Sequence, residues 1–429
     1  MSPQLKTNHV TRFPPCSILS LLPRKCYNTT VIKIEKLIPG GMGLGTDNDG
    51  RKVFFWNALP GETVTKFSIT KSKSHYAEAI AEEIKEPSPH RVEPKDACFL
   101  STSPWQILNY DYELHQKQAL VVEIFREHQI NIATPDIVTD HHDYFYRNKM
   151  EYSLYWNNET EQTQLAFHVR GTHRKLPITS SSIERPEIFQ HAQGIINQLN
   201  NQKKSARDYQ SLLLRCDQDG LVKGGLYEKN HPHPEFPSLT DTILGYSYSY
   251  SPNGFFQINL PVYEMALHEI KKHINTNKVL DLYAGVGTIG LSVARDRKLT
   301  LVEVDRYATS ELFRNCQDSP NQSQNQQHMR FQNRNILAIL AKSEESLEYL
   351  ETDQTVILDP PRAGCDKKLI TKLNEIKPET IIYLSCNPTT QARDIKFLLK
   401  NYQIQTVKTF NFFPHTPHIE NLIVLTKIL

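Results

Sequence analysis

The chain has 429 residues, 39% of them hydrophobic and 22% charged, which is ordinary for a globular protein and long enough for two or three domains. Lysine and arginine number 49 and aspartate and glutamate 47, so the formal net charge is only +2. This balance excludes binding of a polyanion through overall charge and requires any nucleic-acid surface to be a local patch. The longest apolar run near the start, CSILSLL, is too short to span a bilayer, so no membrane partner is predicted.

The seven cysteines lie far apart, without a C-x-x-C pair or the spacing of a metal finger. A reduced setting, and therefore a cytoplasmic protein without a metal site, is expected. Residues 1–34 contain lysine and arginine but no acidic residue. We interpret residues 1–30 as a disordered extension, with an organelle-targeting leader or a nucleic-acid-binding tail as alternatives.

Residues 31–90 predict a small β-barrel. Segments such as VIKIEKLI and KVFFW alternate in polarity and are separated by turns rich in glycine and proline. The stretch TKSKSHY places an aromatic residue beside basic ones. That combination fits either an RNA-contacting face or a solvated strand edge.

Residues 91–250 predict a central α+β domain. The stretch YELHQKQALVVEIFREHQI has apolar residues at helical spacing, and YFYRNKMEYSLYW and QLAFHVRGTHRKL alternate as antiparallel strands do. Basic and aromatic residues are interleaved in both strands, a mixture that suits stacking and phosphate contacts with single-stranded nucleic acid. An ordinary half-exposed sheet would have the same pattern.

Residues 251–429 change to a regular alternation of strands and helices. Strands are predicted at KVLDLY, LTLVEVD, TVILDP, TIIYLSC, IQTVKTFNFF and IENLIVLTKI. The first four are separated by helical patterns, which predicts a parallel sheet covered on both faces. The last two are joined only by PHTPH, too short for a crossover helix, so they should be antiparallel. A mostly parallel sheet closed by one antiparallel hairpin is typical of the α/β class I, Rossmann-like methyltransferases.

The stretch VLDLYAGVGTIGL predicts a strand, a tight turn and a helix, in which Gly285 and Gly287 let a ligand approach the backbone. Glu303 ends the next strand, close to the separation of about 20 residues from which an acid accepts hydrogen bonds from ribose hydroxyls. The full G-x-G-x-x-G spacing of dinucleotide sites is absent. Together with the terminal hairpin, this favours S-adenosylmethionine as the cofactor.

Asp359 ends a further strand in VILDPPRAGCD, where two prolines stiffen the following loop. Enzymes that methylate exocyclic amines usually have an aromatic residue after such prolines, and Arg362 stands there instead. This difference points to another acceptor atom.

Cys386 lies at the tip of the apolar strand IIYLSC, and Asn387 and Pro388 are favourable first residues of a helix. The positive end of that helix dipole should favour the thiolate, so we expect Cys386 to be a nucleophile. A methyltransferase needs one when the acceptor is carbon 5 of a pyrimidine, because thiolate addition at carbon 6 makes carbon 5 nucleophilic.

A base must then remove the proton from carbon 5. The candidate is Glu420, in the turn of the terminal hairpin, with His415 and His418 as rival bases.

The stretches NGFFQIN, DLYAGVGTIGL, VEVD, LDPPRAG, YLSCNPTTQARD and FFPHTPHIE follow one another across residues 253–423. In this combination the sequence resembles the RNA uracil-5-methyltransferase family, which uses S-adenosylmethionine to make 5-methyluridine in tRNA and 23S rRNA. The resemblance implies that Cys386 is the nucleophile and Glu420 the proton acceptor. The residues that it implies around the cofactor and the target base are Gln257, Tyr283, Thr288, Glu303, Asn335 and Asp359.

Residues 31–90 resemble the family's TRAM domain, an RNA-binding β-barrel, with PGGMGLG as its characteristic start. Residues 91–250, including YRNKMEYS, resemble its central RNA-binding domain, and residues 251–429 its catalytic domain. Many 23S rRNA members hold an iron–sulfur cluster on four cysteines, but the matching region reads CFLSTSPWQIL, with Cys98 alone. We therefore expect no iron–sulfur cluster.

The resemblance implies an enzyme that methylates a uridine in RNA. The TRAM-like domain favours 23S rRNA as the substrate, with tRNA as the alternative, and the target uridine should be flipped out of a loop. One rival is an RNA cytosine-5-methyltransferase, whose second cysteine would be Cys365, a residue that also fits a small buried hydrophobe. Another is a non-catalytic RNA chaperone. We expect a monomer.

Overall fold

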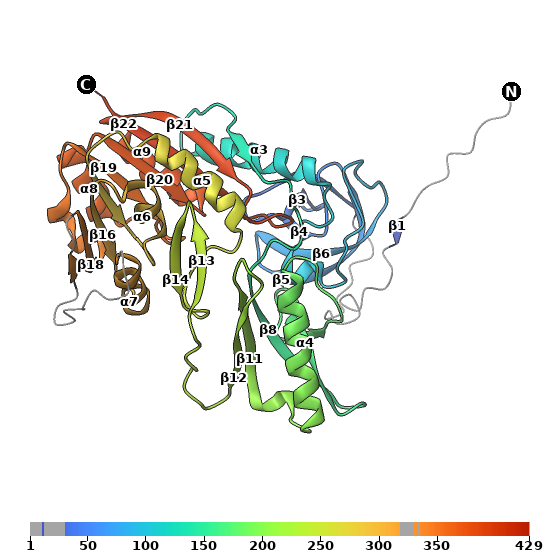
Figure 1. Cartoon of the computed structure of the whole chain (residues 1–429). Coiled ribbons are helices and arrows are strands. Elements are labelled where there is room, and N and C mark those ends of the chain that lie inside the picture. The colour runs from blue at the N-terminus through green and yellow to red at the C-terminus, as the bar shows by residue number, and fades with distance from the viewer. Residues whose placement is uncertain (1–10, 13–30, 318–329, 333–334, 429) are drawn as a thin grey trace.

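The computed structural model describes residues 11–12, 31–317, 330–332 and 335–428. Figure 1 shows a blue β-barrel, a green central domain and a large sheet in orange and red. The extension expected over residues 1–30 lies outside the described residues, apart from the short strand β1 (Thr11–Arg12). That strand pairs with the barrel at Ile84 and Glu83.

The barrel is closed by five strands. They are β2 (Ile32–Leu37), β3 (Gly43–Thr46), β4 (Lys52–Trp56), β5 (Thr63–Ser72) and β6 (Tyr76–Ile84). β5 pairs with both β2 and β6, which closes the ring. Buried and exposed residues alternate along β2 and β4, so Ile32, Ile34 and Phe55 fill the core, and the predicted barrel is confirmed.

The central region begins with the predicted helix, which Asn109 caps by accepting a hydrogen bond from the Tyr112 amide at 2.8 Å. The predicted helix is α3 (Tyr110–Glu127). The other elements of the central region are α2 (Phe99–Thr102), β8 (Lys149–Asn157), β9 (Gln162–His168), β10 (Lys175–Pro177), α4 (Pro186–Asn201), β11 (Tyr209–Cys216) and β12 (Val222–Glu228). The strands form an antiparallel sheet in the order β10-β9-β8-β11-β12, and α4 packs against β9 and β11.

The remaining elements build a mostly parallel sheet with helices on both faces. They are α5 (Leu260–Lys272), β15 (Lys278–Leu282), α6 (Thr288–Ala294), β16 (Lys298–Glu303), α7 (Arg306–Asn315), β17 (Arg330–Gln332), β18 (Ile336–Leu340), β19 (Gln354–Leu358), α8 (Lys367–Ile376), β20 (Thr380–Ser385), α9 (Pro388–Leu398), β21 (Tyr402–Phe410) and β22 (Glu420–Lys427). β18, β16, β15, β19 and β20 are parallel, and β22 lies antiparallel between β20 and β21. This confirms the predicted class I fold. The prediction lacked β18, because the short apolar run ILAIL fits a helix as well as a strand.

Two elements from the region predicted as the central domain join the catalytic sheet and its core. β7 (Asp136–Val138) pairs with β21 at the outer edge of the sheet. The hairpin of β13 (Leu239–Ile243) and β14 (Tyr246–Tyr250) packs on α7, and the Tyr248 hydroxyl lies 2.6 Å from that of Ser292. These are long-range contacts, which local sequence patterns do not encode.

Three hydrophobic cores fill the described part of the molecule. One lies inside the barrel and one on the α5, α6 and α7 face of the catalytic sheet. The largest runs without interruption from barrel residues such as Leu37 through α3 and the central sheet to the other face of the catalytic sheet. The barrel, the central region and the catalytic sheet are therefore packed as one body.

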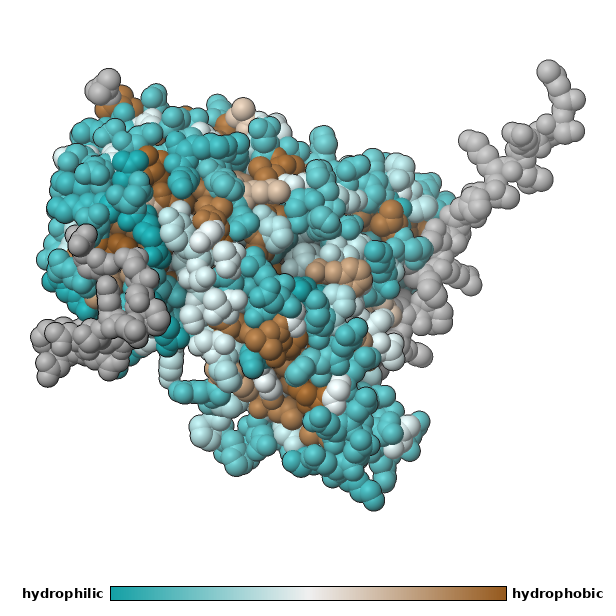
Figure 2. Space-filling view, viewed as in Figure 1, coloured by the Kyte–Doolittle hydropathy of each residue, from teal (hydrophilic) through white to brown (hydrophobic). Residues whose placement is uncertain are grey.

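Figure 2 shows a face that is hydrophilic over most of its area, with apolar residues gathered over the strands of the central sheet beside α4. Among the helices described here, none combines the length and the apolar character needed to cross a bilayer.

The barrel docks on the loop between β21 and β22 through Gly41. The Gly41 carbonyl accepts a hydrogen bond from the Trp105 indole at 2.9 Å. A Cβ atom at Gly41 would lie 2.3 Å from the Cβ of Pro417, closer than two carbon atoms can approach. Gly41 therefore allows the barrel to touch this loop, which carries the candidate base.

We expect Gly41→Ala to separate the barrel from the loop and to lower the free energy of unfolding. Gly40→Ala is the matched control, because both glycines have a φ near +90° but nothing lies within 4 Å of a Cβ at Gly40. Both substitutions strain the backbone, and the overpacking at Gly41 should cost about 1–3 kcal/mol more. Urea unfolding measures this difference, and equal losses in the two variants would contradict the close contact.

Candidate active site

The candidate site lies at the edge where the parallel strands end. After β15, residues 283–287 form a turn in which Tyr283, Gly285 and Gly287 have φ values of 73°, 57° and 90°. A Cβ atom at Gly287 would also lie 2.6 Å from Leu312, so this position requires glycine. α6 begins directly after the turn, with Thr288 as its first residue. Such a turn lets a ligand approach the backbone closely.

Glu303, the last residue of β16, holds this turn. Its Oε2 accepts a hydrogen bond from the Gly285 amide at 2.7 Å, and its Oε1 accepts from the Val304 and Asp305 amides at 2.8 and 2.7 Å. Oε2 has a second lone pair, which can accept a hydrogen bond from a ligand hydroxyl. The neighbouring Val304 is 54% exposed, an apolar surface that the sequence analysis did not identify.

Three buried carboxyl groups lie along the same edge. Asp281 accepts a hydrogen bond from the Gly290 amide through Oδ2 at 2.8 Å, and its buried Oδ1 has no partner among the described residues. Burial raises the pKa of Asp281 to about 8 and that of Asp359 to about 7. Burial, together with the charge of Asp359, raises the pKa of Glu420 well above its usual value. Buried acids of this kind favour a cationic ligand, whose charge would compensate their own.

Cys386 follows β20 at this edge, and α9 begins two residues later. Asn387 caps the helix by accepting a hydrogen bond from the Thr389 amide at 3.2 Å, and Pro388 is the first helical residue. The helix start that the sequence predicted is confirmed.

The pairing of β20 with β22 brings Cys386 and Glu420 together. In this antiparallel ladder Ser385 lies opposite Asn421, so the next residues outward are Cys386 and Glu420. Gln391 of α9 secures the register by donating hydrogen bonds to the Tyr383 carbonyl at 2.8 Å and the Asn421 carbonyl at 3.0 Å. The candidate nucleophile and base are therefore neighbours in space.

The surroundings of Cys386 raise the pKa of its thiol above the ordinary value. Burial, with the negative charges of Glu420 and Asp359, raises its pKa to about 11, against the opposing effect of Arg362. The expectation of a resting thiolate is wrong, because burial and two acidic neighbours outweigh the helix N-terminus. Arg362 remains in contact with the sulfur and favours its ionised form.

Cys365, the candidate second cysteine, lies apart from this arrangement. It is buried against Tyr283 and Tyr383, and burial raises its pKa to about 12. Its environment is that of a small hydrophobic side chain.

A pocket of about 330 Å³ opens in front of Cys386. Its walls come from the barrel, the segment before α3, the central sheet and the loops of the catalytic sheet. The lining side chains with polar atoms are Trp56, Thr102, Arg170, Arg362, Cys386, Asn387, Thr389, Thr416 and His418. Arg170 belongs to the interleaved basic and aromatic residues that the sequence analysis noted in QLAFHVRGTHRKL, whereas Trp56 was not singled out, because it reads as a strand residue of the barrel. Only the fold brings the two together.

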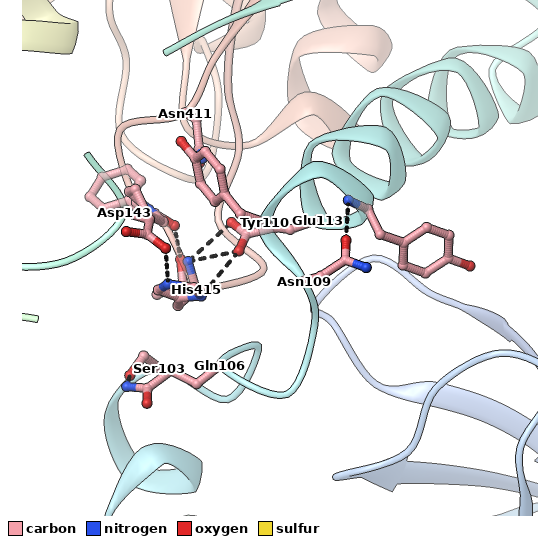
Figure 3. Close-up of polar contacts among 12 residues, drawn as sticks. Ser103, Gln106, Asn109, Tyr110, Glu113, Asp143, Asn411 and His415 are labelled. Atoms are coloured by element: carbon pink, nitrogen blue, oxygen red, sulfur yellow. Dashed lines mark hydrogen bonds and ion pairs between the residues drawn. The ribbon is translucent and has the colours of Figure 1, made fainter. Parts of the chain in front are cut away.

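The two rival bases have different surroundings. His418 lines the pocket, and burial together with nearby cations, Arg362 first among them, lowers its pKa to about 4. It is therefore neutral at physiological pH. His415 lies in a buried cluster, where its Nε2 is 3.1 Å from Asp143 and its amide donates to Glu113 at 2.9 and 3.0 Å. Figure 3 shows the His415 ring between Asp143 and Glu113.

This cluster holds the loop between β21 and β22. Consecutive carbonyls at residues 412–415 accept hydrogen bonds from Asn259, Lys117, Tyr146 and Trp105, at 3.2, 3.0, 3.0 and 3.0 Å. Lys117 is completely buried and also pairs with Glu113 at 2.7 Å. The loop that presents Glu420 is thus tied to α3 and to the central region.

Three of the other predicted site residues are partly or fully buried near the site. Gln257 lies 9% exposed in the segment before α5, and its carbonyl accepts a hydrogen bond from Asn148 at 3.0 Å. Tyr283 packs toward Ser343 and Cys365, and Thr288 hydrogen-bonds with the buried Tyr263, both at the carboxyl edge.

The structure contradicts the expectation that Asn335 lies around the cofactor and the target base. It is exposed and precedes β18, and its carbonyl accepts a hydrogen bond from Leu299, the partner of β18 at the start of the parallel ladder. It lies at the opposite edge of the sheet from Glu303 and cannot contribute to this site. Its placement at the cofactor rested on the resemblance alone, and the strand β18, which the sequence analysis did not predict, shows that Asn335 lies just before the start of that strand.

Within the described residues, no three His, Cys, Asp or Glu side chains converge as a metal site requires. Cys98 is buried at the start of α2, and burial raises its pKa to about 12. Cys16 and Cys26 lie outside the described residues. The lack of an iron–sulfur cluster stays a prediction.

Comparison with known proteins identifies the family. A family model described as tRNA (Uracil-5-)-methyltransferase matches residues 241–428, and a TRAM domain model matches residues 28–81. The chain belongs to the RNA uracil-5-methyltransferase family. Its barrel is a TRAM domain, and the protein is an RNA methyltransferase.

Relatives of this methyltransferase match over most of its length. Uncharacterized RNA methyltransferases of Bacillus anthracis and Nanoarchaeum equitans are 27% and 26% identical to it, covering 93% and 94% of this chain and 96% of each relative. The solved structure of the Pyrococcus abyssi tRNA (uracil-54, C5)-methyltransferase in complex with S-adenosyl-L-homocysteine has a similar fold, with a TM-score of 0.70. The two sequences are 22% identical, and the alignment covers 92% of this chain and 99% of the Pyrococcus abyssi chain.

We expect iodoacetamide to alkylate Cys386 of this methyltransferase slowly at neutral pH. The thiolate is the reactive form, so the rate should rise about tenfold per pH unit up to the pKa of about 11. Arg362→Met removes the group that lowers the pKa and should slow alkylation severalfold at pH 9. Mass spectrometry locates the label, with Cys365 as an internal unreactive control. A rate that is constant between pH 7 and 10 would contradict the raised pKa.

Lys117→Met should leave Glu113 as a buried carboxylate without its lysine partner and remove the hydrogen bond from Lys117 to the Phe413 carbonyl. We expect the free energy of unfolding to fall by about 3–5 kcal/mol. Adding Glu113→Gln removes the uncompensated charge and should restore much of that loss. Chemical denaturation measures both variants, and a double variant no more stable than the single one would show that the ion pair does not hold this loop.

Proposed function

We propose that the protein methylates carbon 5 of a uridine in RNA, with Cys386 as the nucleophile and Glu420 as the base. The observation that carries this proposal is the ladder of β20 and β22, which pairs Ser385 with Asn421 and so brings Cys386 beside Glu420. The pocket in front of Cys386 has room for a flipped base and faces the TRAM domain. The buried Cys365 does not fit the second cysteine of a cytosine-5-methyltransferase.

S-adenosylmethionine fits the carboxyl edge as methyl donor. The unpartnered Oδ1 of Asp281 and the raised pKa of Asp359 indicate acids that lack a cation. The open lone pair of Glu303 suits a ribose hydroxyl, and the turn at Gly285 has open space where a side chain would stand. When bound, this group supplies a positively charged sulfonium with a transferable methyl group.

The residues of the chain divide the reaction between them. Cys386 first loses its thiol proton to the solvent, and the thiolate, which Arg362 favours, adds to carbon 6 of uracil, while the electron pair of the ring double bond moves to make carbon 5 nucleophilic. After carbon 5 has gained the methyl group, Glu420 accepts its proton, and the thiolate leaves as the ring double bond re-forms. Glu420 must be ionised for this step, and Arg362 is the cation that favours that form.

For the RNA itself, the sequence favours 23S rRNA through the TRAM domain. The Pyrococcus abyssi enzyme, which is named for a tRNA, has a similar fold across 92% of this chain. A similar fold therefore occurs in an enzyme named for tRNA, and we carry both RNA classes into the test.

RNA containing 5-fluorouridine should trap the enzyme covalently, because Glu420 cannot remove fluorine as it removes a proton. Cys386→Ala should give no adduct and no turnover. Glu420→Gln should slow turnover by about 10²–10⁴-fold and accumulate an adduct with ordinary uridine RNA. Adducts are measured by denaturing gel with total RNA from a strain that lacks the gene, and sequencing the trapped RNA distinguishes rRNA from tRNA.

Cys365→Ala is the matched control and should form the adduct as the parent protein does. Loss of the adduct with Cys365→Ala but not with Cys386→Ala would overturn the assignment of the nucleophile. RNA binding without any adduct would favour a chaperone.

A further inference from the structure

The pocket in front of Cys386 is built from parts of the chain that are distant in sequence. Pro39, Gly40 and Trp56 come from the TRAM barrel, and Arg170 comes from the turn between β9 and β10 of the central sheet. Arg362 and Cys386 come from the loops of the catalytic sheet on the other side. A ligand in this pocket would touch the TRAM domain and the nucleophile at the same time.

The pocket is strongly cationic. Neither Arg170 nor Arg362 forms an ion pair with a carboxylate among the described residues, although both line the pocket. Arg170, Arg147, Lys117 and Arg362 all act to lower the pKa of His418, which stands in the same wall. Lys117 is paired with Glu113 and Arg362 lies near Glu420, but the two arginines that line the pocket have no carboxylate at ion-pair distance among the described residues and so favour an anionic ligand.

Arg170 is held with its guanidinium in a defined plane. It lies over the Trp56 ring, 4.4 Å from the ring centroid, and its Nε donates a hydrogen bond to the Leu100 carbonyl. The terminal nitrogens point away from that bond, since the guanidinium is a rigid fork. Such an arginine is suited to bidentate binding of a phosphate.

The size of the pocket limits the ligand to a single unpaired nucleotide. A volume of about 330 Å³ is at the lower end of small-molecule sites. A duplex cannot enter such a space, whereas a nucleotide extruded from a loop can.

We propose that Arg170, oriented by Trp56, binds a phosphodiester next to the target uridine in this pocket. This subsite rests on the proposed function, which supplies the uridine at Cys386. It makes the TRAM and central domains part of the wall that aligns the base, in addition to any contact they make with RNA elsewhere.

The test measures protection of Cys386 from iodoacetamide by hexauridylate, a six-nucleotide RNA, using the full chain. We expect protection by the phosphodiester form and none by the hexamer whose linkages are neutral methylphosphonates. A plot of the logarithm of the protection constant against the logarithm of the salt concentration gives a slope that reports the number of phosphates bound. Arg170→Gln should make this slope shallower by about 0.7, the value for one phosphate of a single strand. Arg170→Lys keeps the charge and should keep the slope while weakening protection.

Trp56→Ala should weaken protection about tenfold by releasing Arg170, and Trp56→Phe should restore part of it. Arg297→Gln is the matched control. Arg297 precedes β16 at the opposite edge of the sheet, so protection should be unchanged. The midpoint of thermal unfolding shows that each variant is folded.

Equal protection by the neutral hexamer, or an unchanged salt slope with Arg170→Gln, would overturn the subsite. This outcome is distinct from failure of the proposed function, which is the absence of any adduct with 5-fluorouridine RNA. Protection does not require catalysis, so the two results are obtained separately.

Discussion

The register between β20 and β22 determines the rest of the site. A shift of one residue in this ladder would turn the side chains of β22 to the opposite face and separate Glu420 from Cys386. The structure opposes such a shift through a buried amide network. The Asn421 side chain donates to Gln391 at 2.7 Å and accepts from Thr409 at 3.1 Å, which links α9, β21 and β22. The helix that begins beside Cys386 therefore also secures the strand that begins with Glu420.

Around this ladder the acidic side chains lie on one side of the site and the basic side chains on the other. The carboxyl edge holds Asp281, Asp359 and Glu420, all buried with raised pKa values, and the opposite wall holds arginines without carboxylate partners. Each half is unfavourable alone, because buried or crowded like charges repel one another. A cationic methyl donor on one side and an anionic RNA on the other would relieve both. Cys386 lies between the two halves, and burial, together with the charges of Glu420 and Asp359, raises its pKa.

The sequence was sufficient to predict the elements whose information is local. The barrel, the helix over residues 110–127, the turn at Gly285 and the helix start at Asn387 each depend on short patterns, and all are found in the structure. The prediction failed where the cause is long-range. ILAIL becomes a strand by pairing with β16, and only this long-range pairing shows that Asn335, which the resemblance implied near the cofactor, lies at the opposite edge of the sheet. The helix dipole at Cys386 was recognised, but burial and the charges that oppose it come from other segments.

The strand β7 has a consequence for how the protein can be divided. It comes from the central region yet forms the outermost strand of the catalytic sheet by pairing with β21. A fragment that begins at residue 251 would expose β21 as an unpaired edge, which is a template for association between copies. It would also lack Lys117 and Trp105, whose hydrogen bonds hold the loop before Glu420. The boundary that the sequence analysis drew at residue 251 is thus no boundary for folding, and the central region is also a structural part of the catalytic sheet.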